Sequence, residues 1–197
     1  MRTIKLIGLT ALTALAAMAL IGVSSAMAEG STALCKVDQA ECAPGNLFGT
    51  VHEESVGKAT LLSSTLNVEC NVLFSGTAKL GNPATVTGKF TYSGCNNSCS
   101  VVEQGGPSVI TVLRLGHELA DVTGKGEVKL TCLFGFVKCV YNGTGLQGHG
   151  LGPLLSTQKN GEVRIEGQET HIVSGSCPAS AFLDLLTTPL EATYISS

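Results

Sequence analysis

Apolar and polar residues alternate along much of this chain. In residues 66–74, "LNVECNVLF", the apolar even-numbered positions alternate with Asn67, Glu69 and Asn71. The same period of two recurs in residues 85–92 ("TVTGKFTY"), 127–134 ("EVKLTCLF") and 162–166 ("EVRIE"). Because side chains point alternately to the two faces of a strand, this period predicts β-strands with one buried face.

Short turn-forming sequences separate these stretches, among them "KLGNP", "QGGPS" and "QKNG". Only residues 116–122 ("GHELADV") and 180–186 ("SAFLDLL") are predicted as short helices. Many short strands with few helices are typical of antiparallel sheets that pack on themselves. The sequence therefore predicts an all-β fold, an antiparallel β-sandwich or a barrel-like single domain.

The amino terminus has the pattern of a secretory signal peptide. Arg2 and Lys5 precede a long apolar run, and Ala26 and Ala28 supply the small residues of a cleavage site. The alternative is an uncleaved membrane anchor, because the run approaches the ~18 to 20 residues that span a bilayer. We expect cleavage, which divides the chain into a signal peptide, 1–28, and a secreted β-rich domain, 29–197, without a membrane span in the mature chain.

The charge of the mature chain excludes one class of partner. Removal of the signal peptide leaves 10 basic and 15 acidic residues, a net charge of about −5. No cluster of basic residues remains that would neutralise a phosphate backbone. We therefore expect no nucleic-acid partner.

The cysteines predict disulfides. All eight follow the predicted cleavage site, at Cys35, Cys42, Cys70, Cys95, Cys99, Cys132, Cys139 and Cys177. An even number of cysteines in an exported chain is typical of disulfides, here four, which staple the domain. The alternative is a structural zinc site at Cys95 and Cys99, whose spacing zinc tolerates but which lack a second close pair of ligands.

One pairing follows from a predicted hairpin. If residues 135–136 form a two-residue turn, Cys132 and Cys139 lie directly opposite each other on the same face of the hairpin. Cys35 and Cys42 share this spacing and are predicted to pair as well. The other four cysteines allow three pairings, of which we prefer Cys95–Cys99 with Cys70–Cys177.

The glycine-rich stretch at 143–153 resembles a dinucleotide-binding fingerprint only in part. Gly143, Gly145 and Gly148 follow a strand-like run with the required spacing. The fingerprint also needs a helix behind the glycines, but residues 149–159 contain two more glycines and a proline, which disfavour a helix. We therefore expect no cofactor and interpret the stretch as a mobile connection between two strands.

Two histidines are candidate metal ligands. His52 and His117 each stand beside glutamate in the sequence. Neighbouring residues on a strand point to opposite faces, so such pairs can meet at one metal ion only from loops. We expect solvated polar positions, no metal site and no catalytic residue.

The arrangement of cysteines and turns resembles a known group of proteins. "TALCK" followed by Cys42, a strand with "VEC", then "FTYSGC", a later Cys-x6-Cys and a final "CP…ATY" are similar to the uncharacterised exported β-rich proteins of high-GC actinobacteria. The resemblance implies secretion and the fold class, and that group has no assigned activity to carry over.

Together these features predict a secreted or extracytoplasmic protein. We expect a non-enzymatic binding or structural module of the extracellular space or cell envelope, with an unknown extracellular ligand or envelope component as its partner. Such a module would bind through loops on a rigid sheet. The alternative is a secreted hydrolase, metal-assisted through His52 or His117, and a His/Asp/Glu trio in a concave pocket would favour it.

The signal peptide gives the first testable prediction. Signal peptidase should cut after Ala28, so the secreted protein should begin at Glu29. Measurement of the intact mass of the secreted protein checks this, and a species that retains Met1–Ala28 would contradict it.

Overall fold

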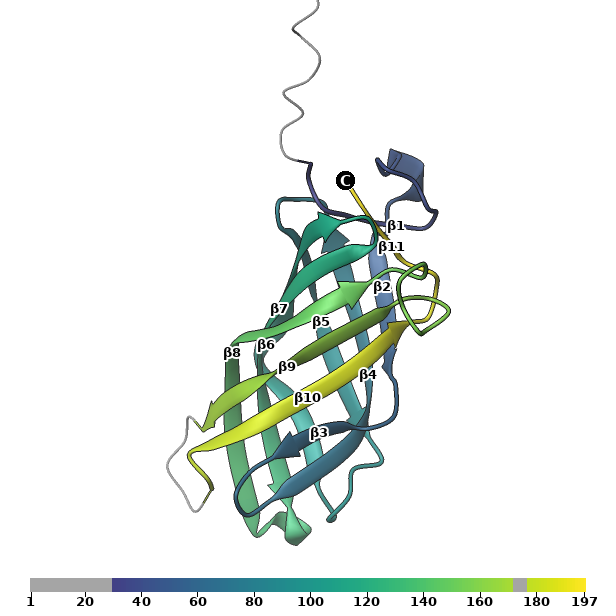
Figure 1. Ribbon diagram of the computed structural model, residues 1–197. Helices are drawn as coiled ribbons and strands as arrows, with labels where there is room; N and C mark the ends of the chain where they lie inside the picture. The colour runs from purple at the N-terminus through teal and green to yellow at the C-terminus, as the bar shows by residue number, and fades with distance from the viewer. Residues whose placement is uncertain (1–29, 172–176) are drawn as a thin grey trace, which may run out of the picture. The chain divides into compact units, whose positions relative to one another are not determined.

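A closed antiparallel barrel dominates the computed structural model, which describes residues 30–171 and 177–197 (Figure 1). The chain divides after Gly30, and Ser31–Ser197 forms one unit. The predicted cleavage site, Ala28 and Glu29, lies outside the described residues. Within those ranges, no helix is long and apolar enough to cross a membrane.

The wall of the barrel is built from consecutive hairpins. Its strands are β2 (Thr50–Ser55), β3 (Ala59–Leu62), β4 (Asn67–Lys79), β5 (Ala84–Ser93), β6 (Ser100–Gly116), β7 (Leu119–Cys132), β8 (Val137–Leu151), β9 (Glu162–His171) and β10 (Ser180–Pro189). The short strands β2 and β3 share one strand position in the sheet, because each of them pairs with β4 and with β10. β10 also pairs with β9, and this pairing closes the sheet. The predicted all-β fold is confirmed, as a barrel and not a sandwich.

The period of two in the sequence places one face of each strand in the interior. On β4, Val68, Cys70, Val72 and Phe74 are each 2% exposed, whereas the residues between them face outward or are half-buried. The same alternation on the other strands fills the barrel with apolar side chains from end to end. An eight-stranded barrel has an interior just wide enough for such filling.

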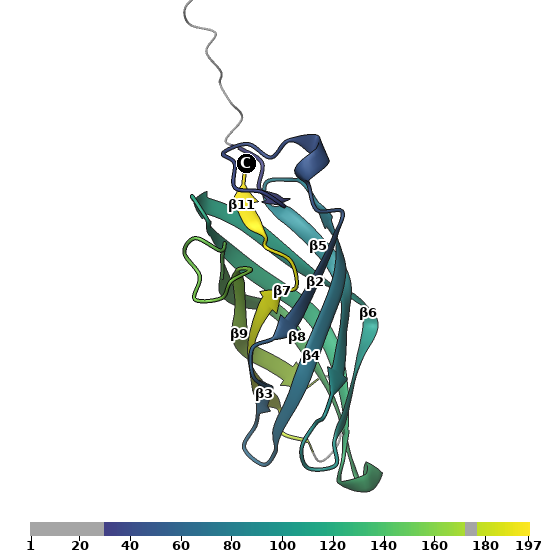
Figure 2. The ribbon, with the colours of Figure 1, turned by 90° about the vertical axis from the view of Figure 1, so that its right-hand side faces the viewer.

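The two ends of the barrel differ. At one end, the short strands β1 (Ala33–Cys35) and β11 (Tyr194–Ser196) pair with each other, and we call this the capped end. The turns β3–β4, β5–β6 and β7–β8 lie at the opposite end, which we call the disulfide end (Figures 1 and 2). Two short 3-10 turns complete the fold, η1 (Pro44–Asn46) and η2 (Leu133–Gly135).

Both predicted helices are wrong. Residues 119–122 begin β7, and residues 180–186 belong to β10. In β10, Ala181 and Leu185 face the core, while hydrogen-bonded strands lie on both sides. Pairing within the sheet therefore overrides a local helical preference.

The glycine-rich stretch is also not a mobile connection. Residues 143–151 belong to β8, which pairs with β7 and with parts of β9. A Cβ atom at Gly148 would lie 1.8 Å from the carbonyl oxygen of Arg164 on β9. Glycine is needed there because the two backbones approach so closely.

The eight cysteines form four disulfides: Cys35–Cys42, Cys70–Cys95, Cys99–Cys132 and Cys139–Cys177. The Cys35–Cys42 pairing is the predicted one. The predicted pairings Cys132–Cys139, Cys95–Cys99 and Cys70–Cys177 are wrong. The zinc alternative is wrong as well, because Cys95 and Cys99 are both oxidised, to different partners.

The register of the β7–β8 hairpin explains the main error. Its turn contains four residues, 133–136, instead of two, so Cys132 lies opposite Val137 and not opposite Cys139. A shift of two residues leaves both cysteines on the inner face of the barrel. There they meet cysteines that lie one to three residues before two other strands, Cys99 before β6 and Cys177 before β10.

The disulfides give a stability prediction. Cys99–Cys132 closes a loop with a sequence separation of 33, whereas Cys35–Cys42 has a separation of only 7. On the chain-entropy model, replacing Cys99 and Cys132 together by serine should lower the free energy of unfolding by about 3 to 4 kcal/mol, against about 2.5 kcal/mol for Cys35 and Cys42. Urea unfolding under oxidising conditions measures both losses. A larger loss for the Cys35–Cys42 pair would contradict the explanation.

Candidate functional site

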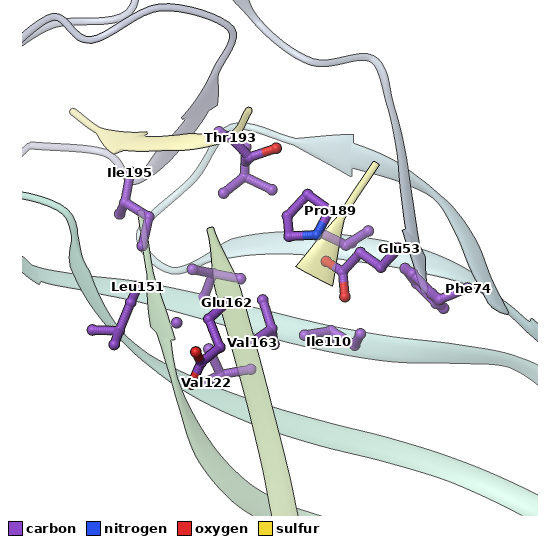
Figure 3. Close-up of a pocket in the computed structure, with 14 residues that line it drawn as sticks. Glu53, Phe74, Ile110, Val122, Leu151, Glu162, Val163, Pro189, Thr193 and Ile195 are labelled. Atoms are coloured by element: carbon purple, nitrogen blue, oxygen red, sulfur yellow. The ribbon is translucent and has the colours of Figure 1, made fainter. Parts of the chain in front are cut away.

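Three small cavities lie among the apolar side chains that fill the described part of the barrel interior. They measure about 30, 40 and 30 Å³, far below the ~300 to 1,000 Å³ of small-molecule sites. Figure 3 shows one of them, where Glu53 and Glu162 approach from different strands and Val163 and Ile110 lie among the apolar side chains around it. Such a cavity has room for a water molecule or two.

Two carboxyl groups nevertheless face this interior. Glu53 is 8% exposed, and its Oε2 accepts a hydrogen bond of 2.6 Å from the Thr187 hydroxyl. Burial raises the pKa of Glu53, and the Thr187 hydrogen bond partly opposes that rise. Glu169 is 4% exposed, its Oε2 has no hydrogen-bond partner, and burial raises its pKa to about 7. Burial disfavours the charged form of both carboxyls, and the cavities beside them are smaller than small-molecule sites.

A cleft of ligand size opens in the wall of the barrel, between β5 and β6. The ladder between these strands runs from Ala84↔Val112 to Gly88↔Ser108 and stops there. β5 continues for residues 89–93, and β6 extends back to Ser100, but over this stretch they are not paired with each other. The cleft between them has a volume of about 560 Å³.

The sequence "QGGPS" causes the strands to separate. It was expected to be a turn between strands, but residues 104–108 form an irregularity inside β6, where the register with β7 shifts between Gln104 and Val109. Gly105 and Gly106 have φ angles of +77° and +109°, which favour glycine. Pro107 has no N–H to donate to a neighbouring strand.

Two disulfides link the strands that border the cleft, β5 and β6, to their neighbours on the side away from the cleft. Cys95 follows β5 and is bonded to Cys70 on β4, whereas Cys99 precedes β6 and is bonded to Cys132 at the end of β7. The disulfides thus join β5 to β4 and β6 to β7, and neither of them joins β5 to β6 across the cleft. The cleft is therefore part of the covalently cross-linked framework.

Glu103 marks the closed end of the cleft. Its Oε2 accepts a hydrogen bond of 2.9 Å from the backbone N–H of Phe90 on β5. Its Oε1 accepts bonds from the N–H and the hydroxyl of Ser108, at 2.7 and 2.6 Å. One side-chain hydrogen bond thus crosses from β6 to β5 where the backbone pairing ends, and the other two lie within β6.

The walls of the cleft combine an apolar floor with exposed strand edges. The half-buried rings of Phe90 and Tyr92 lie 6.3 Å apart between centroids, and both line the cleft. Val101 is half-buried, and Val102 is 59% exposed. Lys89 adds a cation at the rim. The arrangement suits an extended chain with apolar side chains.

The turn between β7 and β8 forms a second exposed feature at the disulfide end. Phe134 and Phe136 are 89% and 88% exposed, and Leu133 is 48% exposed. Leu133 and Phe134 have positive φ angles, 52° and 59°, an uncommon conformation for such residues. This tip is convex, so it can enter a hollow in a partner but cannot enclose a ligand.

Neither histidine that the sequence singles out lines the cleft. His52, on β2, lines a smaller depression of about 370 Å³ together with Lys36 and Glu191. His117 lies in the β6–β7 turn at the capped end, close to Glu118 and Asp38. In the part of the chain that the structure describes, these three form the one group of His, Cys, Asp and Glu side chains with metal-binding spacing.

The cleft was not predicted, although the two segments that line it, residues 89–92 and 101–107, belong to consecutive strands. "QGGPS" was visible as a chain irregularity, but nothing local shows that it falls inside a strand. The chain matches no family model, no curated protein and no solved structure. The resemblance to exported actinobacterial proteins therefore stays a prediction.

Glu169 gives a prediction for the pH dependence of stability. Its folded pKa of about 7 lies above the ordinary value of 4.5, so its contribution to stability is complete below pH ~4.5 and is lost as the pH rises through ~7. The loss is on the order of 3 kcal/mol. Glu169→Gln should therefore unfold less readily than the parent protein at pH 8 and show a shallower fall in stability between pH 5 and 7.

Thermal and urea unfolding across this pH range measure the effect. Glu54→Gln is the matched control, because Glu54 is exposed on the outer face of β2. An unchanged pH dependence in Glu169→Gln would show that the carboxyl is not desolvated as described.

Proposed function

We propose that this protein is an exported, non-enzymatic binding module of the extracellular space or cell envelope, and that it holds an extended polypeptide segment of a partner in the β5–β6 cleft. The observation that carries the proposal is the cleft itself: two strands that run on past the end of their ladder, with about 560 Å³ between them. Four disulfides support an oxidising compartment.

The chemistry of the cleft favours a polypeptide in extended conformation. Where a ladder stops, the edge of a strand offers backbone donors and acceptors at the spacing of another strand, and a bound peptide adds to that edge. Side chains that alternate along the bound segment would place every second residue over Phe90, Tyr92 and Val101. The disulfides and Glu103 fix both strands that border the cleft. The protein therefore loses little conformational freedom when a peptide binds, which favours affinity.

The hydrolase alternative has weaker support. It calls for a His/Asp/Glu trio in a concave pocket, and the trio at Asp38, His117 and Glu118 lines none of the cavities described above. His52 does line a depression, but it does not belong to that trio.

Selection of peptides on the purified protein tests the proposal. Random linear peptides displayed on phage should yield extended, apolar-alternating binders. Amide hydrogen exchange with a selected synthetic peptide should show protection in residues 89–93 and 100–107. Val102→Asp should weaken binding at least about tenfold, because it places an unpaired charge on the wall of the cleft.

Leu113→Asp is the matched control. Leu113 lies on the same strand and is also exposed, at 40%, but it lies outside the cleft. Its affinity for the selected peptide should stay within about twofold of the parent protein. Protection confined to residues 133–136, or equal effects of Val102→Asp and Leu113→Asp, would overturn the proposal and move recognition to the exposed tip or elsewhere.

A further inference from the structure

A cluster of metal-ligand side chains lies at the capped end, away from the cleft. His117 and Glu118 occupy the two-residue turn between β6 and β7, and Asp38 lies in the loop that Cys35–Cys42 closes. One ligand atom from each of the three residues lies within 4.8 Å of the other two. Sequence analysis expected no metal here because neighbours on a strand diverge, but His117 and Glu118 are in a turn, where they converge.

Glu118 is the unusual member of the cluster. Glu118 is only 1% exposed, and its backbone has a positive φ of 57°. Oε1 accepts a hydrogen bond of 3.0 Å from the backbone N–H of Ile195, whereas Oε2 is buried without a partner. A buried carboxylate oxygen that lacks a donor is costly unless a proton or a cation neutralises it.

The surrounding chain is shaped around this carboxylate. A Cβ atom at Gly152 would lie 1.6 Å from Oε2 of Glu118, so only glycine leaves room for the side chain. Glu118 also adopts a backbone conformation that residues with a side chain rarely take. These two features hold the carboxylate in a place where solvation by water is lost, which calls for a ligand that compensates its charge.

We propose that Asp38, His117 and Glu118 bind a divalent transition-metal ion of the zinc class. One imidazole nitrogen and two carboxylate oxygens are a ligand set that suits zinc, whereas calcium and magnesium prefer oxygen ligands alone. Three protein ligands leave a fourth position for water. Zinc–ligand distances of ~2.0 to 2.2 Å require the ligand atoms to approach by about 1 Å, and Asp38 and His117 can do so because both are exposed.

The bound ion would lock the cap of the barrel. Asp38 belongs to the loop that follows β1, and His117 and Glu118 join β6 to β7. The Glu118 carboxylate also accepts a hydrogen bond from the backbone N–H of Ile195 on β11. One ion would therefore connect two segments that are far apart in the sequence, and the hydrogen bond between Glu118 and Ile195 would extend this connection to β11. Its role is to stabilise the capped end, and the proposal is independent of what the cleft binds.

Zinc titration of the mature protein, made without a histidine tag, tests this inference. Isothermal titration calorimetry should show one site. Zinc at about one hundred times its dissociation constant should raise the unfolding temperature by about 5 to 10 °C. Calcium and magnesium should not produce this rise. Asp38→Asn and His117→Gln, both at exposed positions, should each weaken zinc binding at least about tenfold.

His149→Gln is the matched control, because His149 is an exposed histidine on β8 outside the cluster. It should leave zinc affinity unchanged. Glu118→Gln separates metal binding from a purely structural role, since glutamine can still accept the Ile195 hydrogen bond. It should fold and lose the zinc-dependent rise in unfolding temperature. Zinc binding that survives Asp38→Asn and His117→Gln, or a full zinc response in Glu118→Gln, would overturn the inference.

Discussion

The pairing of β10 with β9 on one side and with β2 and β3 on the other is the constraint on which the rest of the structure depends. It turns a meander of hairpins into a closed wall with few free edges. Closure at this strand number fixes the width of the interior, and apolar side chains from every strand fill it. What remains inside is room for single water molecules.

The capped end shows how the barrel accommodates buried charge. Its central carboxylate, Glu118, reaches Ile195 of β11 and so links a turn of the wall to the pair of short strands that covers it. Burial raises the pKa of Glu118, an effect that the Ile195 hydrogen bond partly opposes. A hydrophobic side chain in this place would pack without this cost. The presence of a buried carboxylate therefore points to a use for its charge, in agreement with the cation site proposed there.

Sequence patterns predicted the strands well and the connections poorly. The alternation in residues 66–74 reflects the alternation of inward-facing and outward-facing side chains on β4, so the fold class could be predicted from it. The hairpin register failed because Leu133 and Phe134 take left-handed conformations that neither residue type signals. The cluster at the capped end could not be predicted, since Asp38 and His117 are far apart in the sequence and only the closed barrel brings them together. Local patterns report periodicity, whereas pairing partners depend on the closure of the whole sheet.

The cleft follows from a conflict between closure and the local sequence of β6. A continuous ladder between β5 and β6 would seal the wall, but two glycines with positive φ and Pro107 displace the strand in the middle of its course. Beyond the pair Gly88↔Ser108, the backbone hydrogen bonds between β5 and β6 are missing, and other contacts have to replace them. Glu103 replaces one of them by accepting a hydrogen bond from the N–H of Phe90 on β5, while its other two bonds hold Ser108 of its own strand. The disulfides Cys70–Cys95 and Cys99–Cys132 fix β5 to β4 and β6 to β7. A mere packing defect would be expected to close, because the exposed strand edges would gain by pairing. Cross-links that hold the two strands to their outer neighbours oppose that closure, so the cleft is a feature that the sequence maintains, as a binding site requires.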